Sequence, residues 1–353
     1  MSIRHLLLFC TLPALMGTAL SEPHNHLRGD IRIMFYNVEN YFDTADNPHT
    51  NDNEFLPLGV KEWTYKRYRN KTVNIYKTIV AVGEQEPPEI ICFAEVENQK
   101  VLYDLINSTP LSKYPYSVVH YDSPDQRGID VGIIYRSDRI RIRQSKAISV
   151  KNPANSAWVT RDILYVEGSA GENNSFHLFV NHWPSRLGGV KKSEINRNLA
   201  GQTLRKHVND ILENDSCANI IITGDFNDEP FNRSITEILG AVKFTSRGKC
   251  SNLYNLSASL AATCKCGTYR YRSEWDMFDQ FIVSGAMLVN DKNSLTTCIS
   301  CIHVAQHHFL LTNDEKYGGK QPSRTYLGPA YKGGFSDHLP VYLDIYFNDV
   351  EIK

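Results

Sequence analysis

Polar side chains that could bind a metal ion or transfer a proton recur where apolar segments of this sequence end. Asn37 follows "IRIMFY", Glu95 follows "EIICFA", and Asp225 follows "NIIITG". The whole set is Asn37, Glu95, His182, Asp225, Asn227, Asp279, Asp337 and His338. Each one alone could be an ordinary turn residue, because Asp and Asn favour turns. Together they predict one cleft, because the ends of neighbouring strands can converge at one edge of a sheet.

The chemistry of this set points to phosphate esters. Carboxylates and amides without a set of thiolates suit a hard cation such as Mg²⁺ or Mn²⁺. Such an ion keeps several waters and binds through one or two carboxylates and the phosphate of the substrate. Hydrolysis also needs a base that activates water, and an Asp beside a His orients and tunes the imidazole for proton transfer. The set is therefore typical of divalent-metal-dependent phosphoester hydrolysis.

The elements that must position these groups alternate between strands and helices. Apolar runs predict strands over residues 31–38, 89–96, 128–136, 176–183, 219–225, 277–284 and 335–347. Helical periodicity predicts helices over residues 65–83, 98–108, 193–212 and 232–239. Several strands follow one another without a helix between them, which favours mixed sheets with helices outside, a layered α/β sandwich. Residues 245–306 are expected to be insertions and loops on the same domain.

Two helices carry more detailed expectations. Ser193 is the predicted N-cap of helix 193–212. Gly83 is expected to end helix 65–83. The predicted apolar face of that helix carries Val73, Tyr76, Ile79 and Val80.

Length and composition limit the class of protein. The 353 residues suffice for one large α/β domain, which we expect over residues 28–349. A hydrophobic fraction of 42% with 22% charged residues argues against disorder. The formal net charge of −1 provides no global basic field for nucleic acid, so a polyanion would be met by a local patch or by metal.

The N-terminus predicts export. Arg4 and His5 precede the apolar run "LLLFCTLPALMGTAL", which is too short to cross a bilayer comfortably and ends in small residues. Residues 1–20 are therefore predicted to be a signal peptide, with a buried first helix or a membrane anchor as the alternatives. We expect a secreted or periplasmic monomer without a stable membrane anchor.

The cysteines are consistent with export to an oxidising compartment. Of eight, seven remain once Cys10 leaves with the signal peptide. Cys92 is expected to be a buried strand thiol. For the rest, disulfides are favoured over free thiols, and "CKC" with "CISC" could instead supply four zinc thiolates.

Six motifs in order resemble one protein family. "FYNVEN", "CFAEVEN", "VNHWPSR", "GDFND", "FDQFIVS" and "SDHLPV" look like the signature of the endonuclease/exonuclease/phosphatase (DNase I-like) superfamily. The resemblance covers about residues 31–346 and is closest to secreted bacterial nuclease-type members. It implies a four-layer α/β/β/α sandwich of two mixed sheets flanked by helices. It also implies divalent-metal-dependent phosphoester hydrolysis.

The resemblance implies how metal and substrate are held. Glu95 would be the principal metal ligand, with Asn37 and Asp337 beside it, and Mg²⁺ or Mn²⁺ as the ion. Asn37 would also contact the phosphate. Arg127 would bind phosphate through its planar guanidinium, and Arg186 would reach the substrate from a glycine-containing loop.

The resemblance also implies the catalytic groups. His182 would contact the phosphate as a donor or acid. Asp225 and Asn227 would orient the nucleophilic water and bind the phosphate. His338 would be the general base, and Asp279 would orient it.

Several neighbouring residues admit two interpretations. Glu97 could bind metal, although a solvated loop acid is favoured. Asp130 could pair with His182 or Arg127, or form a surface ion pair. Trp183 could stack on a base, or pack in the interior. Glu229, like Asp228 beside it, is expected near the positive end of the short helix that follows.

The favoured function is a secreted metal-dependent phosphodiesterase, a nuclease acting on DNA, RNA or both. The alternative within the family is a phosphatase or a phospholipid-headgroup phosphodiesterase, sphingomyelinase-like or acting on inositol phosphates. A lipid enzyme would expose an apolar hairpin, for which "VAQHHFLL" is the one candidate segment. A non-catalytic binding protein is the remaining alternative. Such a protein should have lost Glu95, Asp225 or His338, and all three are present.

Overall fold

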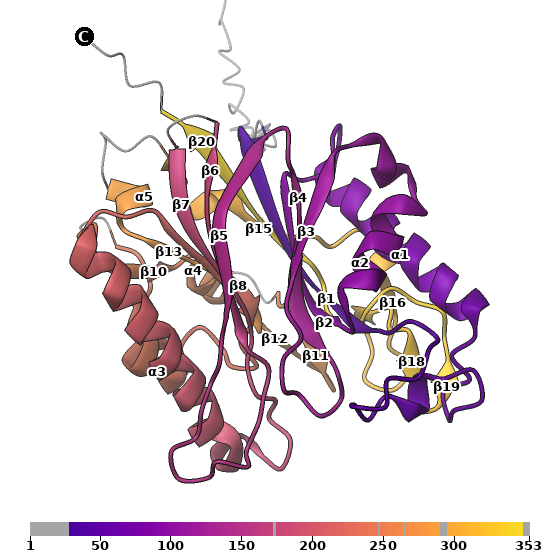
Figure 1. Cartoon of the computed structure of the whole chain (residues 1–353). Coiled ribbons are helices and arrows are strands. Elements are labelled where there is room, and N and C mark those ends of the chain that lie inside the picture. Colours follow the sequence, from indigo (N-terminus) through magenta and orange to yellow (C-terminus); the bar gives the residue numbers. More distant parts are fainter. Residues whose placement is uncertain (1–27, 172–173, 246–247, 264–265, 290–294, 349–353) are drawn as a thin grey trace, which may run out of the picture.

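Two mixed β-sheets pack face to face, and helices cover their outer faces (Figure 1). This computed structural model describes residues 28–171, 174–245, 248–263, 266–289 and 295–348. The signal peptide expected at residues 1–20 lies outside the described residues. The four-layer α/β/β/α architecture that the resemblance implies is confirmed.

The first sheet runs in the order β14–β20–β1–β2–β4–β3, with β15 also paired to β20. Its central strands β1 and β2 are parallel, and β20 and β4 flank them in the antiparallel direction. The strands are β1 (Ile31–Tyr41), β2 (Ile90–Val96), β3 (Tyr116–His120), β4 (Asp130–Arg136), β14 (Leu295–Thr296), β15 (Ile302–Val304) and β20 (Val341–Phe347).

The second sheet runs in the order β5–β6–β7–β8–β13–β10–β9. Here β7 and β8 are parallel, and β13 runs antiparallel to β8. The strands are β5 (Ile140–Ile148), β6 (Ile163–Ala170), β7 (Asn174–His182), β8 (Ile220–Asp225), β9 (Ala241–Val242), β10 (Leu253–Asn255) and β13 (Asp279–Ser284). The long hairpin of β5 and β6 is absent from the expectations above.

Three two-stranded hairpins lie toward one end of the sandwich, at the bottom of Figure 1. They pair β11 (Tyr269–Tyr271) with β12 (Glu274–Asp276), β16 (Leu311–Asn313) with β17 (Lys320–Pro322), and β18 (Tyr326–Leu327) with β19 (Ala330–Tyr331).

Helices on the two outer faces complete the layers (Figure 1). α1 (Tyr65–Gly83) and α2 (Gln99–Asn107) cover the first sheet, and α3 (Val190–Asn214) with a π-helical segment (Ser234–Leu239) covers the second. The remaining helical pieces are short: α4 (Ser257–Thr263), α5 (Ala286–Val289) and 3-10 turns at Asn53–Phe55, Pro110–Lys113, Ile299–Cys301 and His308–Leu310.

The central core fills the space between the sheets. Strand β20 shows how the sequence builds it, because Val341, Leu343 and Ile345 alternate inward and are buried. Facing side chains such as Leu178 and Val180 of β7 join the same cluster from the second sheet. Separate apolar clusters lie under α1 and α2 and under α3.

The predicted bounds of helix α1 are correct, but its predicted face is wrong in part. Ile75, Ile79 and Val82 are buried against the first sheet, whereas Val80 is exposed. These three positions are four and three residues apart, so they share one face of the helix.

The last strand and helix α3 begin at other residues than predicted. β20 starts at Val341, so Asp337 and His338 lie in the loop before it. α3 starts at Val190 after Gly189, and Ser193 lies inside the first turn with its hydroxyl donating to the Gly189 carbonyl. Ser193 is therefore not the N-cap. The prediction of loops for residues 245–306 is also wrong in part, because β10 there joins the second sheet beside β13, the strand predicted over residues 277–284.

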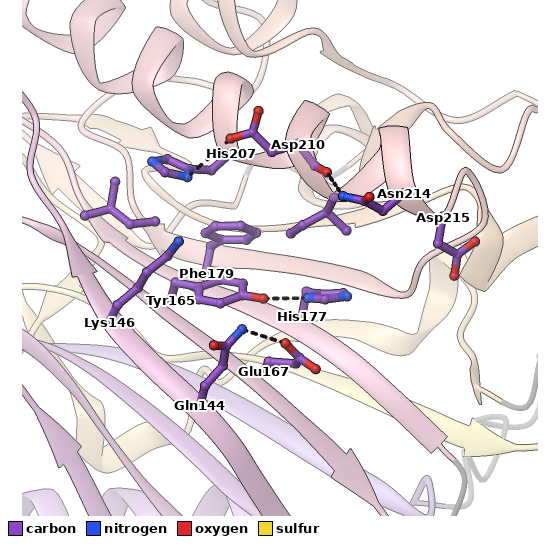
Figure 2. A pocket seen from close by; sticks show the side chains of 12 residues that line it. Gln144, Lys146, Tyr165, Glu167, His177, Phe179, His207, Asp210, Asn214 and Asp215 are labelled. Carbon is purple, nitrogen blue, oxygen red and sulfur yellow. Dashed lines mark hydrogen bonds and ion pairs between the residues drawn. The ribbon is translucent and has the colours of Figure 1, made fainter.

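A cavity of about 280 Å³ lies between α3 and the outer face of the second sheet (Figure 2). Tyr165, His177 and Phe179 line its sheet side, and Nδ1 of His177 lies 2.8 Å from the Tyr165 hydroxyl. Because side chains alternate along a strand, His177 and Phe179 face away from the interior that Leu178 and Val180 fill. None of the predicted catalytic side chains lines this cavity.

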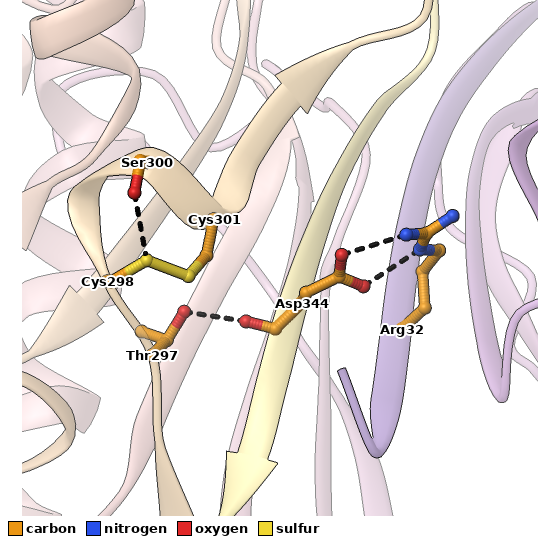
Figure 3. The surroundings of a disulfide bond; sticks show 6 residues. All are labelled: Arg32, Thr297, Cys298, Ser300, Cys301 and Asp344. Atoms are coloured by element: carbon orange, nitrogen blue, oxygen red, sulfur yellow. Dashed lines mark hydrogen bonds and ion pairs between the residues drawn. A yellow bond between two sulfur atoms is a disulfide. The ribbon is translucent and has the colours of Figure 1, made fainter. Parts of the chain in front are cut away.

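The cysteines follow the disulfide expectation in part. Cys298 and Cys301 form a disulfide beside β20, near the buried pair of Arg32 and Asp344 (Figure 3). Cys266 is also disulfide-bonded. The alternative of a zinc site with four cysteine thiolates is therefore wrong for this structure.

Three described cysteines, Cys92, Cys217 and Cys250, are free thiols. Cys92 is buried on β2, as expected. A hydrogen bond with the Cys217 thiol raises the pKa of Cys250 to about 11. In the described part of the chain, no helix is long and apolar enough to cross a bilayer.

Candidate active site

Strand register brings the predicted catalytic side chains into one row. On the second sheet His182 of β7 pairs with Asp225 of β8, and Asp225 pairs with Asp279 of β13. On the first sheet Asn37 of β1 pairs with Ala94, the residue before Glu95. Because β1 and β2 contact β7 and β8 across the sandwich, both sheets contribute to one cluster.

Asp225 is the centre of this cluster. Its Oδ2 accepts a hydrogen bond from Asn37 Nδ2 at 3.0 Å, and so links the two sheets. The same oxygen lies 3.6 Å from His182 Nε2 and 3.8 Å from His338 Nε2. Its Oδ1 accepts the backbone N–H of Asn227 at 2.9 Å. Burial raises the pKa of Asp225 to about 6.

His338 is held from both ends. Its Nδ1 lies 2.7 Å from Oδ2 of Asp279, whose side chain is fully buried. Ser336 fixes the loop, because its hydroxyl accepts the His338 backbone N–H and donates to the Asn37 carbonyl. The ring of Tyr269 packs against the imidazole with centroids 4.9 Å apart. The predicted orientation of His338 by Asp279 therefore agrees with the geometry.

The surroundings shift the pKa values of the two histidines in opposite directions. Burial lowers the pKa of His182 well below its usual value, and the positive charges of Arg161 and Arg127 lower it further. Burial also lowers the pKa of His338, but the carboxylates of Asp279 and Asp225 outweigh it and raise that pKa well above its usual value. The environment therefore favours the neutral form of His182 and the protonated form of His338.

Strained backbone supports two of the site residues. Glu95 has φ of +63° at a bulge in β2, and Asn227 has φ of +50° just after β8. Glu95 Oε2 accepts the backbone N–H of Asn40 at 2.9 Å, and its Oε1 lies 3.9 Å from His182 Nε2. A non-glycine residue in this region costs free energy and persists where surrounding contacts enforce it. The bulge re-aims the Glu95 carboxylate toward the cluster.

Gly224 serves close packing rather than a sharp turn. It lies inside β8 with φ of +155°, and a Cβ there would stand 2.3 Å from the Asn181 carbonyl oxygen of β7. Any larger residue would push β8 away from β7. The alignment of His182 beside Asp225 depends on that contact.

Two further buried charged side chains, Glu39 and Lys71, lie near Asp337. Glu39 accepts the Thr325 backbone N–H at 2.6 Å, while Lys71 donates to Thr325 Oγ1 at 2.6 Å. Burial, and then the charge of Asp337, raise the pKa of Glu39 to about 7. Burial lowers the pKa of Lys71 to about 8. Asp337 itself lies 3.1 Å from an Arg324 nitrogen.

The sequence patterns did not identify Glu39 or Lys71. Glu39 follows Asn37 by two residues, but β1 is irregular between Asn37 and Tyr41 and Glu39 has a φ of +52°, so regular strand alternation does not place its side chain. Lys71 gave no signal, because it lies in a helix that otherwise presents an ordinary amphipathic pattern.

Arg161 is a further positioning residue that the sequence did not reveal. Its buried guanidinium donates to the backbone carbonyls of His182 and Trp183 at 3.3 and 2.7 Å, and to Asp125 Oδ2 at 3.0 Å. It therefore fixes the end of β7. Arg127 has a side chain that is 51% exposed and lies 3.8 Å from Asp125, at the rim rather than in the cluster.

Arg186 is engaged by other groups of the protein at a partly exposed position. Its Nε donates to the Asn227 carbonyl at 2.8 Å, and another nitrogen donates to Asn232 Oδ1 at 3.0 Å. The guanidinium also stacks 4.6 Å from the Phe278 ring centroid. The structure therefore places Arg186 as a support for the Asn227 loop. Asn227 Nδ2 donates to the Trp183 carbonyl, so this side chain also holds the loop.

The interpretations of Asp130 and Glu97 are wrong. Asp130 is buried, lies 3.2 Å from His120 Nε2 and bonds to Ser123, so it meets neither of its expected partners and is not a surface pair. Glu97 is buried and accepts the Asp43 backbone N–H at 2.6 Å, so it is a structural carboxyl rather than a solvated loop acid.

Trp183 and the acids after Asn227 have structural contacts. Trp183 is 1% exposed and meets Phe226 edge to face, which confirms the packing interpretation. Asp228 Oδ2 lies 2.7 Å from Arg197 Nε in a buried ion pair. Glu229 accepts the Met277 backbone N–H at 3.0 Å. Neither acid depends on a helix end for its role.

The cluster suits a divalent cation by its donor types. Glu95, Asp225 and Asp279 supply carboxylate oxygens, and Asn37 supplies an amide. Asp279 Oδ1 and His182 Nδ1 are buried polar atoms without a hydrogen-bond partner among the described residues. Unpaired buried polar atoms are costly, so a polar ligand in this cluster would stabilise it. Oxygen donors without thiolates match a hard metal ion.

Comparison with known proteins gives one family model and several similar folds. The model of the endonuclease/exonuclease/phosphatase family matches residues 32–346. No curated protein matches the chain in sequence. The human Nocturnin catalytic domain with bound sulfate anion is 20% identical with a TM-score of 0.55, over 91% of this chain and 96% of that chain.

Two further solved structures share the fold at low identity. A mannosyl-6-phosphatase from Bacteroides thetaiotaomicron is 15% identical with a TM-score of 0.54, over 90% of this chain and 100% of that chain. TDP2 from D. rerio, complexed with single strand DNA product, is 16% identical with a TM-score of 0.53, over 89% and 98% of the two chains.

Proposed function

This chain belongs to the endonuclease/exonuclease/phosphatase family of metal-dependent phosphoester hydrolases, and on that premise we propose that it hydrolyses phosphodiester bonds of DNA or RNA. The observation that carries the proposal is the cluster around Asp225, which joins Asn37 from one sheet to His182 and His338 beside the other. A binding protein would have no need of a buried carboxylate between two histidines.

Each side chain has a task in this proposal. Glu95, Asn37 and Asp337 would hold Mg²⁺ or Mn²⁺, which when bound supplies positive charge to the phosphoryl group and acidifies a water molecule. Asp279 keeps His338 oriented, so that Nε2 of the ring can donate a proton to the oxygen that leaves phosphorus when the water oxygen bonds to it. The carboxylate of Asp225 lies 3.6 Å from His182 Nε2 and 3.8 Å from His338 Nε2, and it accepts a proton from the attacking water.

His182 has a different task from His338. It is buried, which lowers its pKa, and its Nε2 lies between Glu95 and Asp225. We assign it the task of a hydrogen-bond donor to the phosphate, which costs no change of protonation. Arg161 holds its backbone in place.

A nuclease is favoured over the alternatives by the surroundings of the site. The structural neighbours include both an enzyme captured with single-stranded DNA and a sugar phosphatase, so the fold serves both classes. The cluster adjoins a groove of about 760 Å³ whose charged lining residues are mostly basic, and which is larger than one phosphate group requires. The candidate lipid-contact segment at residues 304–311 contains no exposed large hydrophobic side chain.

We also propose that the protein acts in an oxidising compartment, secreted or periplasmic. The support is the disulfide of Cys298 with Cys301, because such bonds persist outside the reducing cytosol. Fractionation of the native host with N-terminal sequencing of the mature protein tests this. An unprocessed cytoplasmic chain would overturn it.

The activity is tested with a substrate panel on the full chain. Single-stranded DNA, plasmid, RNA, sphingomyelin, inositol phosphates and mannose 6-phosphate are each incubated with Mg²⁺ or Mn²⁺. We expect hydrolysis of nucleic acid, arrest by excess chelator, and recovery when the cation is restored.

Two outcomes would contradict this proposal. Hydrolysis of lipid or sugar phosphates with intact nucleic acid would overturn the nuclease assignment. Undiminished cleavage in excess chelator would overturn the metal role. The variant Asp225→Asn serves as the inactive control, and it should keep the wild-type melting curve.

A further inference from the structure

A groove of about 760 Å³ runs away from His338 along the short hairpins. Strand β11, the hairpin of β16 and β17, and residues 323–332 form its walls. These elements contact one another directly, because Arg270 of β11 donates to the backbone carbonyls of Gly318 and Lys320 at 2.8 and 2.6 Å. They lie at the lower end of the sandwich in Figure 1.

The groove and the active site share a wall. Tyr269 lines the groove, and its ring lies 4.9 Å from that of His338. Arg324 also lines the groove, and one of its nitrogens lies 3.1 Å from Asp337 Oδ2. A polymer with its scissile phosphate at His338 could therefore continue directly into the groove.

The groove has an excess of basic side chains, whereas the whole chain has almost no net charge. Five of its lining side chains are basic and two are acidic, while the whole chain has a net charge of −1. Arg270 is buried against Asp314 and builds the wall. Arg272, Lys316 and Lys332 are exposed. Their charge is therefore available to a ligand with several phosphates.

Exposed aromatic rings accompany these cations. Tyr271 is 58% exposed and Tyr317 is 43% exposed. The Arg272 guanidinium lies 5.2 Å from the Tyr271 ring centroid, and Lys316 Nζ lies 5.1 Å from that of Tyr317. Each pair combines a flat apolar face with a positive charge. That is the combination a nucleotide needs, with its base on the ring and its phosphate on the cation.

We propose that this groove binds an unpaired stretch of a nucleic acid strand next to the scissile phosphate. Bases stack on Tyr271 and Tyr317, and phosphates meet Lys316 and Lys332. The proposal rests on the proposed nuclease function and narrows it to single-stranded segments, because paired bases in a duplex cannot present their faces to a tyrosine. A sugar phosphate has no base for either ring.

Binding is tested without catalysis. Fluorescence anisotropy measures the Kd of a labelled oligo-dT and of a matched duplex for the full chain in excess chelator. Tyr271→Ala and Tyr317→Ala should each weaken binding of the single strand by about 5- to 150-fold, the range for loss of one stacked base. Tyr103→Ala is the control, because Tyr103 is also 43% exposed but lies on α2.

The charge contribution has its own variants. Lys316→Ala with Lys332→Ala should weaken binding and make the salt dependence of log Kd shallower. Lys206→Ala on α3, whose side chain is 74% exposed, should change neither. Duplex bound as tightly as the single strand, or tyrosine variants that match Tyr103→Ala, would overturn the inference.

Catalysis separates this inference from the proposed function. The tyrosine variants should raise the KM for a single-stranded oligonucleotide but leave hydrolysis of bis(p-nitrophenyl) phosphate unchanged, since this small diester needs only the cluster around Asp225. A wild-type protein that cleaves neither compound defeats the proposed function. Cleavage of the oligonucleotide with unchanged KM in both tyrosine variants would overturn only the proposal that the groove binds an unpaired strand.

Discussion

The carboxylate of Asp279 lies 2.7 Å from Nδ1 of His338, at a point where Asp279 is fully buried and His338 nearly so. The pair joins the first residue of β13 to the loop before β20, two segments 59 residues apart. Because Nδ1 is committed to Asp279, Nε2 is the ring nitrogen that faces Asp225 and the substrate. A buried orienting carboxylate of this kind fixes both the tautomer and the direction of an imidazole.

Replacing that carboxylate should affect turnover rather than substrate binding. Asp279→Asn removes the charge that raises the pKa of His338 and permits the wrong ring orientation. We expect kcat on bis(p-nitrophenyl) phosphate to fall by about 10²- to 10⁴-fold, the usual contribution of positioned acid–base groups. KM should change little, because Asp279 has no surface that a substrate could touch.

The matched control for this exchange is Asp210→Asn, at an exposed acid on α3. It should leave kcat unchanged. Wild-type turnover in Asp279→Asn would contradict the assignment of His338 to proton transfer.

The positions of the catalytic residues in the sequence were readable because each follows or opens an apolar strand. Asn37, Asp225 and Asp279 lie in the cluster for that reason. Arg161 could not be read in the same way, because it acts through backbone carbonyls that only the folded chain brings near. Arg186 has a sequence position like that of a substrate ligand, yet its guanidinium is engaged by Asn227 and Phe278.

The backbone at Glu95 should be strained, and two variants can show it. Glu95→Ala and Glu95→Gly both lack the carboxylate and should both be inactive. Alanine keeps a Cβ at φ of +63°, whereas glycine adopts this region freely. We therefore expect the glycine variant to be more stable in urea by about 1 kcal/mol.

The same pair of variants at Lys77 is the control for this comparison. Lys77 is exposed within α1, where glycine should be less stable than alanine by about 1 kcal/mol. An alanine variant at position 95 that is more stable than the glycine variant would show that this backbone carries no strain.

The fold was more predictable in its layers than in its edges. Continuous apolar runs such as "IIIT" in β8 identify central strands, because such strands are buried on both faces. Strand β5 gives no such run, since most of it is exposed or half-buried, whereas its partner β6 contains the buried run "ILYV". The face of α1 was predicted wrongly in part because it includes Thr72 and Thr78. Their hydroxyls donate to carbonyls of their own helix, which lets these polar residues be buried, and a pattern of apolar residues does not detect them.

Stability should depend on pH through Glu229. Burial, and then a hydrogen bond with Asp276, raise the pKa of Glu229 to about 7 in the folded protein. The folded state therefore binds this proton more tightly than the unfolded state, whose carboxyl has a pKa of about 4.3. The contribution is fully present below the unfolded pKa and is lost as pH rises toward the folded pKa.

Glu229→Gln should remove that dependence. Its free energy of unfolding in urea should exceed that of the wild type at about pH 8 and approach it at about pH 4.5. Glu237→Gln, at an exposed position on the π-helical segment that follows Glu229, should show no such trend. A difference between Glu229→Gln and wild type that is constant with pH would contradict the assignment.

The buried pair of Arg32 and Asp344 should be the most sensitive point for stability outside the active site. Two hydrogen bonds of 2.8 Å join them across β1 and β20 (Figure 3). Arg32 also donates to the Val82 carbonyl of α1. Asp344→Asn leaves a buried guanidinium without its counter-charge. We expect a loss of about 3–5 kcal/mol in urea unfolding.

The double variant Arg32→Met with Asp344→Leu distinguishes charge from packing. It removes both charges, so most of the lost stability should return, because apolar replacement of a buried pair is often neutral. Turnover per folded molecule should stay at the wild-type value in both variants, since Arg32 lies five residues, or about 17 Å of strand, before Asn37. A double variant no more stable than Asp344→Asn would show that the stability of this strand pair depends on packing around the two side chains rather than on their charges.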